Sequence, residues 1–365
     1  MSRGFSLYLD ALRFGAALVV ALSHLAYPRF TEGRWIWIRE LNLGSDAVVI
    51  FFVLSGLVIS HSVSREGIGP GRYAFDRITR LVSVAAPALA LGFALDRLGA
   101  ARAPELYAGW WYAPLPLWEQ LLRGLSFSSE WAGLQARLGT NGPFWSLSYE
   151  AAYYALFGIA VFARGARRWA LLAAGAMIVG INVLLLAPCW LLGVWVQRRI
   201  AAGRLPTGGS AAALALAPAA LYALALAVDV PGALSLGRAA LAWELRFSDE
   251  VLWNSLLAVL VAAHLAGMAG LLAKAGAGRG EAAIRWLAGG SFSLYLMHYP
   301  LLQALAALGL SGPGLGHDLL LLGATCALCF AFAALFERPL GRWRALASAL
   351  LRPRTPRRAA GTPGA

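Results

Sequence analysis

The sequence has few charged residues and very few cysteines. Charged residues make up 13% of its 365 positions, about half the share typical of soluble globular domains. The three cysteines, Cys189, Cys326 and Cys329, all lie within apolar runs, so a disulfide framework is excluded. The last two have C-x-x-C spacing, but inside an apolar run this spacing favours helix packing over metal or redox chemistry. No metal site is expected.

Hydrophobic residues, by contrast, make up 59% of the chain and recur in runs long enough to cross a bilayer. We therefore predict an all-α, polytopic membrane helical bundle with about ten transmembrane helices. The expected spans are 6–27, 44–62, 81–97, 147–163, 169–183, 184–197, 211–228, 251–273, 286–309 and 318–336. We expect a membrane domain at 1–340 and a basic tail at 341–365, whose many Arg and Pro residues predict disorder.

Acidic residues are scarce, and the net charge is +13. The basic residues lie in the connections between spans, so they indicate membrane orientation and not nucleic-acid binding. With the N-terminus inside, one side collects 21 of the 31 Lys and Arg residues. We therefore predict cytoplasmic N- and C-termini, a bacterial inner-membrane location, and contact of the basic tail with membrane lipids.

The region between Arg168 and Arg198 is the weakest part of this topology. Its 29 residues span about 43 Å as a helix, too little for two perpendicular full crossings. Because basic clusters flank it on both sides, we expect a short hairpin that turns near Asn182 or Pro188. A single span here would reverse every later connection.

The first span carries polar residues at a real energetic cost. Arg13 and His24 are eleven residues apart, so both project from one helix face, with Asp10 one turn below Arg13. An arginine near a helix centre costs about 2.5–3.5 kcal/mol on insertion scales. One interpretation is that Arg13 snorkels to the interface and pairs with Asp10. The other is a lined cavity in which Arg13 attracts an anion and His24 moves a proton.

Four later segments carry polar residues or small residues in distinctive patterns. The stretch 46–60, DAVVIFFVLSGLVIS, places Ser55 and Gly56 where another helix can approach closely. In 75–81, FDRITRL, two arginines lie one turn apart, a spacing that suits either positive-inside anchoring or a shared phosphate ligand. The other two segments are 141–158, NGPFWSLSYEAAYYALFG, and 291–302, SFSLYLMHYPLL.

Together with LDALRFGAALVVALSH at 9–24, these motifs resemble acyltransferase family 3, the integral-membrane O-acyltransferases, over positions 10 to about 340. The last span ends in FERPL, which is also similar, while Ser83 departs from the family pattern. The resemblance implies transfer of an acyl group, with acetyl favoured, from cytoplasmic acyl-CoA to a hydroxyl of an envelope polysaccharide, oligosaccharide or glycolipid. It implies no metal cofactor.

The site residues follow from the matched motifs. The resemblance implies that Arg77 and Arg80 bind the coenzyme A end of the donor, with Arg13 guiding it. His24 is expected to act as general base or transient acyl acceptor, and Glu150 to meet and orient it. As residues that line the substrate cavity we expect Asp10, Trp145, Ser148, Tyr295 and His298.

Other interpretations stay open at this stage. Glu150 suits a helix cap or a solvated carboxylate as well, and His298 suits a structural hydrogen bond as well as a ligand contact. A membrane transporter or flippase of a glycan or lipid intermediate would also place charges inside its spans. It would be favoured by discontinuous helices and internally repeated halves, and the sequence shows neither clearly. A non-catalytic scaffold would explain the packing motifs but not the polar stripe of the first span.

Overall fold

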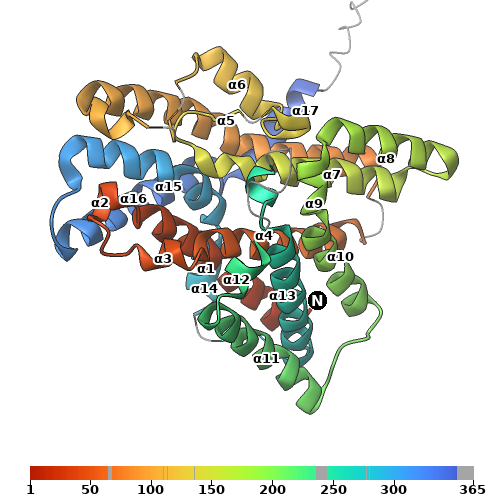
Figure 1. Cartoon of the computed structure of the whole chain (residues 1–365). Coiled ribbons are helices and arrows are strands. Elements are labelled where there is room, and N and C mark those ends of the chain that lie inside the picture. The colour runs from red at the N-terminus through yellow and green to blue at the C-terminus, as the bar shows by residue number, and fades with distance from the viewer. Residues whose placement is uncertain are drawn as a thin grey trace, which may run out of the picture.

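The computed structural model describes residues 1–64, 68–109, 111–112, 114–134, 136–235, 245–276, 278 and 280–351, and these ranges contain helices and no strand (Figure 1). The helices are α1 (Arg3–Leu25), α2 (Pro28–Thr31), α3 (Trp37–Glu40), α4 (Leu43–Val63), α5 (Pro70–Arg102), α6 (Leu117–Leu125), α7 (Trp145–Phe162), α8 (Gly165–Val179), α9 (Ile181–Leu185), α10 (Ala187–Ala201), α11 (Gly208–Ala227), α12 (Val230–Leu234), α13 (Val251–Leu271), α14 (Glu281–Ala288), α15 (Ser291–Leu305), α16 (Leu315–Phe336) and α17 (Leu340–Leu351). The predicted all-α class is confirmed.

Within the described ranges, eight helical segments are long and apolar enough to cross a membrane. They contain α1, α4, α5, α9 with α10, α11, α13, α15, and α16 with α17. The two further expected spans, 147–163 and 169–183, correspond to α7, which carries several polar residues, and to α8, which has only 15 residues. The expectation of about ten membrane helices is therefore consistent with the structure.

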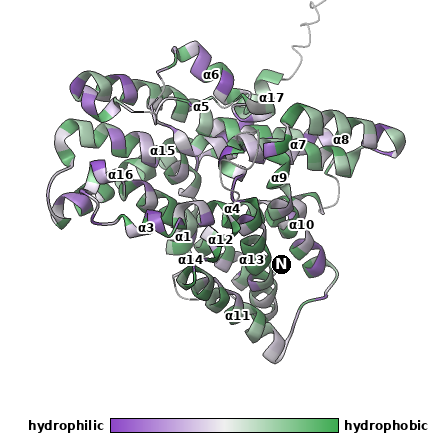
Figure 2. Ribbon diagram, in the orientation of Figure 1, coloured by the Kyte–Doolittle hydropathy of each residue, from purple (hydrophilic) through white to green (hydrophobic). Residues whose placement is uncertain are grey.

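Large hydrophobic side chains cover the outer faces of these helices. Leu216, Leu221 and Leu224 of α11 are exposed, as are Leu319, Leu320 and Leu335 of α16. Figure 2 shows hydrophobic residues along most of α8, α11 and α13. Such broad apolar surfaces are unfavourable in water and suit a hydrocarbon environment.

Helices α4 and α10 cross at their glycines. A Cβ atom on Gly56 would lie 1.9 Å from the carbonyl oxygen of Trp190, and one on Gly193 would lie 1.9 Å from that of Val53. Each helix therefore offers a glycine to the backbone of the other. This arrangement confirms the predicted packing role of Gly56, and it fixes α10 against the helix that carries Ser55.

The region between the two arginine clusters turns at Gly180. This residue has φ +84° and ends α8, after which α9 and α10 follow. Its backbone packs against Ala132, since a Cβ atom here would lie 3.2 Å from the Ala132 Cα and nitrogen atoms. Only glycine suits both conditions. The chain thus turns two residues before Asn182, one of the two positions expected.

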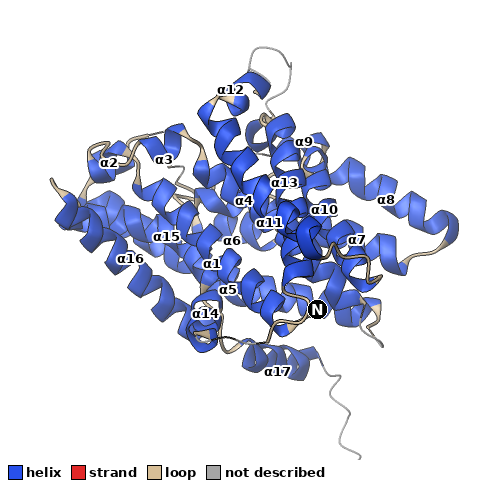
Figure 3. Ribbon diagram, turned by 90° about the horizontal axis from the view of Figure 1, so that it is seen from below, coloured by secondary structure: helices blue, strands red, loops and turns tan. Residues whose placement is uncertain are grey.

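The N-terminus, α14 and α17 lie at one end of the molecule, and α2, α3 and α12 at the other (Figure 3). Two boundaries differ from expectation. The span expected from 286 begins at Ser291, because Gly289 and Gly290 separate α14 from α15. The tail expected to be disordered from 341 is helical as far as Leu351. Arg344 in this helix pairs with Asp76 of α5 at 3.4 Å. Residues 352–365 lie outside the described residues.

Candidate active site

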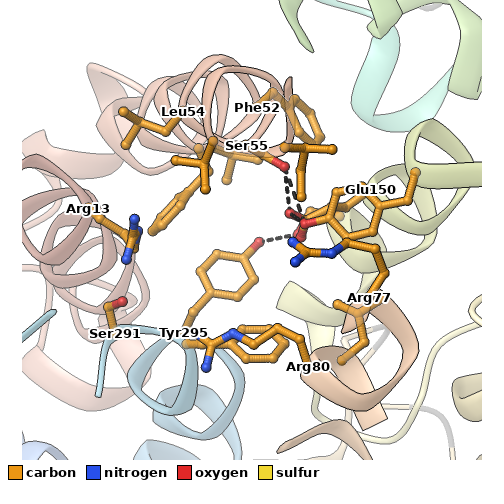
Figure 4. Close-up of a pocket in the computed structure, with 17 residues that line it drawn as sticks. Arg13, Phe52, Leu54, Ser55, Arg77, Arg80, Glu150, Ser291 and Tyr295 are labelled. Atoms are coloured by element: carbon orange, nitrogen blue, oxygen red, sulfur yellow. Dashed lines mark hydrogen bonds between the residues drawn. The ribbon is translucent and has the colours of Figure 1, made fainter. Parts of the chain in front are cut away.

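A cavity of about 200 Å³ lies between α1, α4, α5, α7 and α15. Apolar side chains such as Phe51, Phe52 and Leu54 form much of its wall, while a small set of polar groups points inward. Figure 4 shows Arg13, Arg77 and Arg80 around a common space together with Glu150 and Tyr295. An apolar pocket with few converging polar groups is the usual form of a small-molecule site.

Three arginines give this cavity its positive charge. Arg80 pairs with Glu337 at 2.9 Å, and Glu337 also accepts a hydrogen bond from the backbone nitrogen of Ser293. Arg13 pairs with Asp10 at 3.3 Å. Arg77 differs from both, because its Nε is buried without a hydrogen-bond partner among the described residues. A buried N–H donor that lacks a partner is costly unless a ligand accepts from it, and a phosphate oxygen is a strong acceptor for an arginine.

Glu150 belongs to a hydrogen-bonded cluster on one wall of the cavity. Ser55 donates to its carboxylate at 2.7 Å, and the Tyr154 hydroxyl donates to the same oxygen. Trp190 in turn donates to the Ser55 hydroxyl at 3.1 Å. Ser55 therefore does more than allow close packing, which was the interpretation favoured from sequence. Tyr154 lies one helical turn after Glu150 in α7, and this spacing in the sequence could have indicated the contact between them.

The two imidazoles of His24 and His298 face each other, with Nε2 of His298 3.2 Å from Nδ1 of His24. The Nδ1 atoms of both rings also lie next to backbone carbonyls, of Val20 at 2.9 Å and of Leu294 at 2.8 Å. Carbonyls only accept, so each neutral ring carries its proton on Nδ1. His298 then accepts from His24 through Nε2, and the lone pair of His24 lies on its own Nε2.

This geometry corrects the expected pairing of His24 with Glu150. The carboxylate binds Ser55 and Tyr154, whereas His24 binds Val20 and His298. Glu150 lines the cavity, and neither histidine is among its lining residues. Tyr295 lines it and also packs edge-on against His298, with ring centroids 6.3 Å apart. The sequence placed both residues near the outer ends of their helices, but it could not show which neighbour each would face.

The remaining predicted residues have separate places. Tyr295 donates to the Pro143 carbonyl at 3.1 Å and shares a hydrogen bond with Ser146. Ser148 is buried and donates to the Phe127 carbonyl, so it holds a loop and does not line the cavity. Asp10 binds Arg13 and Arg285 near the surface. Trp145 lines a second, smaller cavity and stacks on Phe247 with 4.0 Å between ring centroids.

Comparison with known families assigns the chain a class of chemistry. A family model described as an acyltransferase domain matches residues 6–334. The chain belongs to acyltransferase family 3. Searches of curated proteins and of solved structures each found no match. Family membership and the apolar helices together make the protein a multi-pass membrane acyltransferase.

An aromatic and basic cluster in this acyltransferase was missed from sequence. Arg29 lies over the ring of Tyr27 at 4.2 Å and donates to Gln303 and to the hydroxyl of Tyr299. The Tyr299 ring is 4.6 Å from that of His24. Burial among these rings lowers the pKa of Arg29 from its ordinary value. The sequence could have indicated Arg29 through its closeness to His24 in the stretch HLAYPRF. Its partners Gln303 and Tyr299 could not be predicted in this way, because they lie some 270 residues away.

We looked for side chains that could bind a metal ion in the described part of the chain. No group of three or more His, Cys, Asp or Glu side chains there is placed to hold a metal ion.

Proposed function

We propose that this acyltransferase moves an acyl group, with acetyl the first candidate, from acyl-CoA to a hydroxyl group of an envelope polysaccharide, oligosaccharide or glycolipid. Family membership supports the acyl transfer. The observation that carries the choice of donor is the cavity among the membrane helices that Arg13, Arg77 and Arg80 line together.

Coenzyme A carries phosphate groups that guanidinium groups bind through paired hydrogen bonds. Arg77 offers a buried Nε that has no partner within the described ranges, and it lies one helical turn from Arg80. Arg80 is already neutralised by Glu337, so Arg77 supplies most of the available attraction. The apolar wall of the cavity suits the thinner pantetheine arm. Tyr295 lines this cavity and packs against His298, so we expect its ring to move aside when the thioester is delivered to His24.

His24 provides the base. Its Nε2 lone pair takes the proton of the acceptor hydroxyl as the hydroxyl oxygen attacks the thioester carbonyl carbon. The carbon–sulfur bond then breaks, and the imidazolium returns the proton to the departing coenzyme A thiolate. The charge that forms on His24 is stabilised through Nδ1–H by the neutral His298 and by the Val20 carbonyl. A direct attack of His24 on the thioester would use the same nitrogen.

The orientation that fits this scheme puts the arginine-rich ends in the cytoplasm, where acyl-CoA is made. Arg77 and Arg80 lie in the first three turns of α5, close to Arg344 of α17. His24 lies at the opposite end of α1 from Arg3. We therefore place the protein in the bacterial inner membrane, with donor binding near the cytoplasmic face and transfer nearer the outer one. The termini then contact cytoplasm and lipid headgroups.

The test is transfer of radiolabelled acetyl from acetyl-CoA to envelope polysaccharide by membranes that contain the protein. His24→Ala is expected to lower transfer at least about 100-fold, the usual contribution of a general base. Arg77→Gln is expected to raise the KM for acetyl-CoA about tenfold, because it removes a charge-assisted contact.

Two substitutions serve as matched controls. His317 lies in an exposed position next to the Pro313 carbonyl and lines neither cavity, so His317→Ala is expected to leave transfer unchanged. Arg72 is exposed and pairs with Asp76 on the surface of α5, so Arg72→Gln is expected to leave the KM unchanged. Full transfer by the His24→Ala variant would overturn the mechanism, and no transfer by the unsubstituted protein with any acyl-CoA would overturn the function.

A further inference from the structure

A second cavity lies beside the N-terminal end of α7. It holds about 20 Å³, which is room for one water-sized group. Trp145 and Phe247 form an apolar side of this cavity. Its polar lining residues are Ser129, Glu130, Arg137, Asn141 and Arg246. Trp145 was expected to line the substrate cavity. It lines this second cavity and not the larger one that Arg13, Arg77 and Arg80 line, which we call the arginine cavity.

Asn141 has an unusual environment here. It is 3% exposed, and both its amide nitrogen and its amide oxygen are buried without a hydrogen-bond partner among the described residues. A buried amide that makes no hydrogen bond costs roughly 1–3 kcal/mol. The amide offers a donor and an acceptor side by side, and a hydroxyl group needs both.

The groups around Asn141 are held firmly. Glu130 is 3% exposed and pairs with Arg246 at 3.2 Å. Its backbone is also fixed, because the Glu130 nitrogen donates a hydrogen bond to the Ser148 hydroxyl. The rings of Trp145 and Phe247 are parallel within 4°, with centroids 4.0 Å apart. Asn141 thus lies between an ion pair and aromatic rings, a setting that suits a polyhydroxylated molecule, which has both hydroxyl groups and apolar faces.

The second cavity is linked to His24 through Tyr299. Gly142, the neighbour of Asn141, lies beside the Tyr299 ring, since a Cβ atom there would be in van der Waals contact with it at 3.6 Å. The same ring packs on His24, at 4.6 Å between centroids. The same segment accepts a hydrogen bond from Tyr295 through the Pro143 carbonyl. One aromatic ring thus contacts both the segment that lines the second cavity and the proposed base.

We infer that Asn141 binds a hydroxyl group of the acceptor, and that this contact selects a polyhydroxylated acceptor and presents a neighbouring hydroxyl to His24. The inference rests on the proposed function and deepens it by assigning the acceptor a binding residue. Donor binding takes place in the arginine cavity, so the contact with Asn141 affects recognition of the acceptor alone.

The experiment measures acetyl transfer in reconstituted vesicles to polysaccharide extracted from a strain that lacks the protein, titrated by its hexose content. Asn141→Ala is expected to raise the apparent KM for this polysaccharide about tenfold. The KM for acetyl-CoA is expected to stay close to that of the unsubstituted protein. The midpoint of thermal unfolding is expected not to fall, because the variant removes a buried amide that has no partner among the described residues. Asn141→Ser keeps a donor and an acceptor and is expected to recover part of the loss.

Asn254→Ala is the matched control. Asn254 is 1% exposed, and its amide oxygen is also buried without a partner among the described residues, but it lines neither cavity described above. It is expected to leave the polysaccharide KM unchanged. An unchanged KM in the Asn141→Ala variant, or equal losses for donor and acceptor, would show that the cavity holds only a structural water and would overturn the inference. Absence of acetyl transfer by the unsubstituted protein would instead overturn the proposed function.

Discussion

At the scale of single residues, the pair of histidines makes a specific prediction. His298 accepts a hydrogen bond from Nδ1 of His24 and so stabilises the imidazolium that forms when His24 takes a proton. A hydrogen bond to a charged group contributes about 1.5–3 kcal/mol. His298→Ala is therefore expected to lower kcat about 10- to 100-fold, with little change in the KM for acetyl-CoA.

The conservative variant distinguishes this positioning role from a purely structural one. His298→Gln keeps an acceptor atom near His24 and is expected to recover part of kcat, whereas lost packing would not be restored by a shorter, flexible amide. Steady-state kinetics of both variants in the same vesicles provide the measurement. A His298→Ala variant with unaltered kcat would show that the two rings merely pack together.

Glu130 makes a prediction about pH. Burial raises the pKa of its carboxyl from 4.5 to about 7, even though Arg246 and Arg137 act to lower it. In the unfolded chain the carboxyl releases its proton near pH 4.5, while in the folded protein it keeps the proton until about pH 7. Folding therefore becomes less favourable as the pH rises between these values, by up to about 3 kcal/mol.

Glu130→Gln has no such proton to lose and provides the reference. As the pH rises from 4.5 to 7, the midpoint of thermal unfolding of the unsubstituted protein is expected to fall relative to that of this variant. Scans in detergent at several pH values measure it. A difference that stays constant across this range would mean that Glu130 ionises normally in the folded protein.

These residues also show what sequence alone could give. The spacing of Arg77 and Arg80 on one helix, and the shared helix face of Arg13 and His24, follow from 3.6 residues per turn. The partners of these residues do not follow, because Glu337 is 257 positions from Arg80 and His298 is 274 positions from His24. Such contacts depend on how helices pack, and several packings satisfy the same hydropathy pattern.

At the scale of helices, the crossing of α4 and α10 predicts a strong effect of a single methyl group. The Cβ atom of an alanine at position 193 would lie 1.9 Å from the Val53 carbonyl oxygen and 2.7 Å from the Leu57 nitrogen. Both are backbone atoms, so the helices must separate. We expect Gly193→Ala to destabilise the protein by about 1–3 kcal/mol, the usual cost of overpacking.

Gly323 of α16 provides the control. A Cβ atom there would have no neighbour within 4 Å in the part of the chain that the structure describes, so Gly323→Ala is expected to be neutral or to stabilise the protein by up to about 1 kcal/mol. Thermal unfolding in detergent compares the two variants. Equal stability of both would show that α4 and α10 do not cross at this glycine.

The ends of helices could be predicted where hydropathy changes sharply along the chain. They were harder to predict where a glycine ends the helix. The runs that became α4, α11 and α13 begin and end within a few residues of expectation. The turn at Gly180 and the break at Gly289 and Gly290 interrupt apolar stretches without any change of hydropathy. In both cases a close approach or backbone conformation sets the boundary, and these depend on neighbours distant in sequence.

At the scale of the whole molecule, the distribution of charge predicts how the protein sits in the membrane. With the N-terminus inside, the connections on that side hold 21 of the 31 Lys and Arg residues and those on the other side hold nine. Exposed Ala202, after α10, belongs to the basic side, and exposed Ser126, after α6, to the other. The two positions therefore report opposite faces of the membrane.

The measurement uses a variant in which Cys189, Cys326 and Cys329 are alanine, with one new cysteine at a time. A membrane-impermeant maleimide is expected to label Ser126→Cys in intact cells, and to label Ala202→Cys only after the membrane is opened. The cysteine-free parent is the control for background labelling and for retained acetyl transfer. The reverse pattern would place Arg77 and Arg80 outside the cytoplasm, where a cytoplasmic acyl-CoA could not reach them, and both labels in intact cells would refute the predicted alternation of the spans.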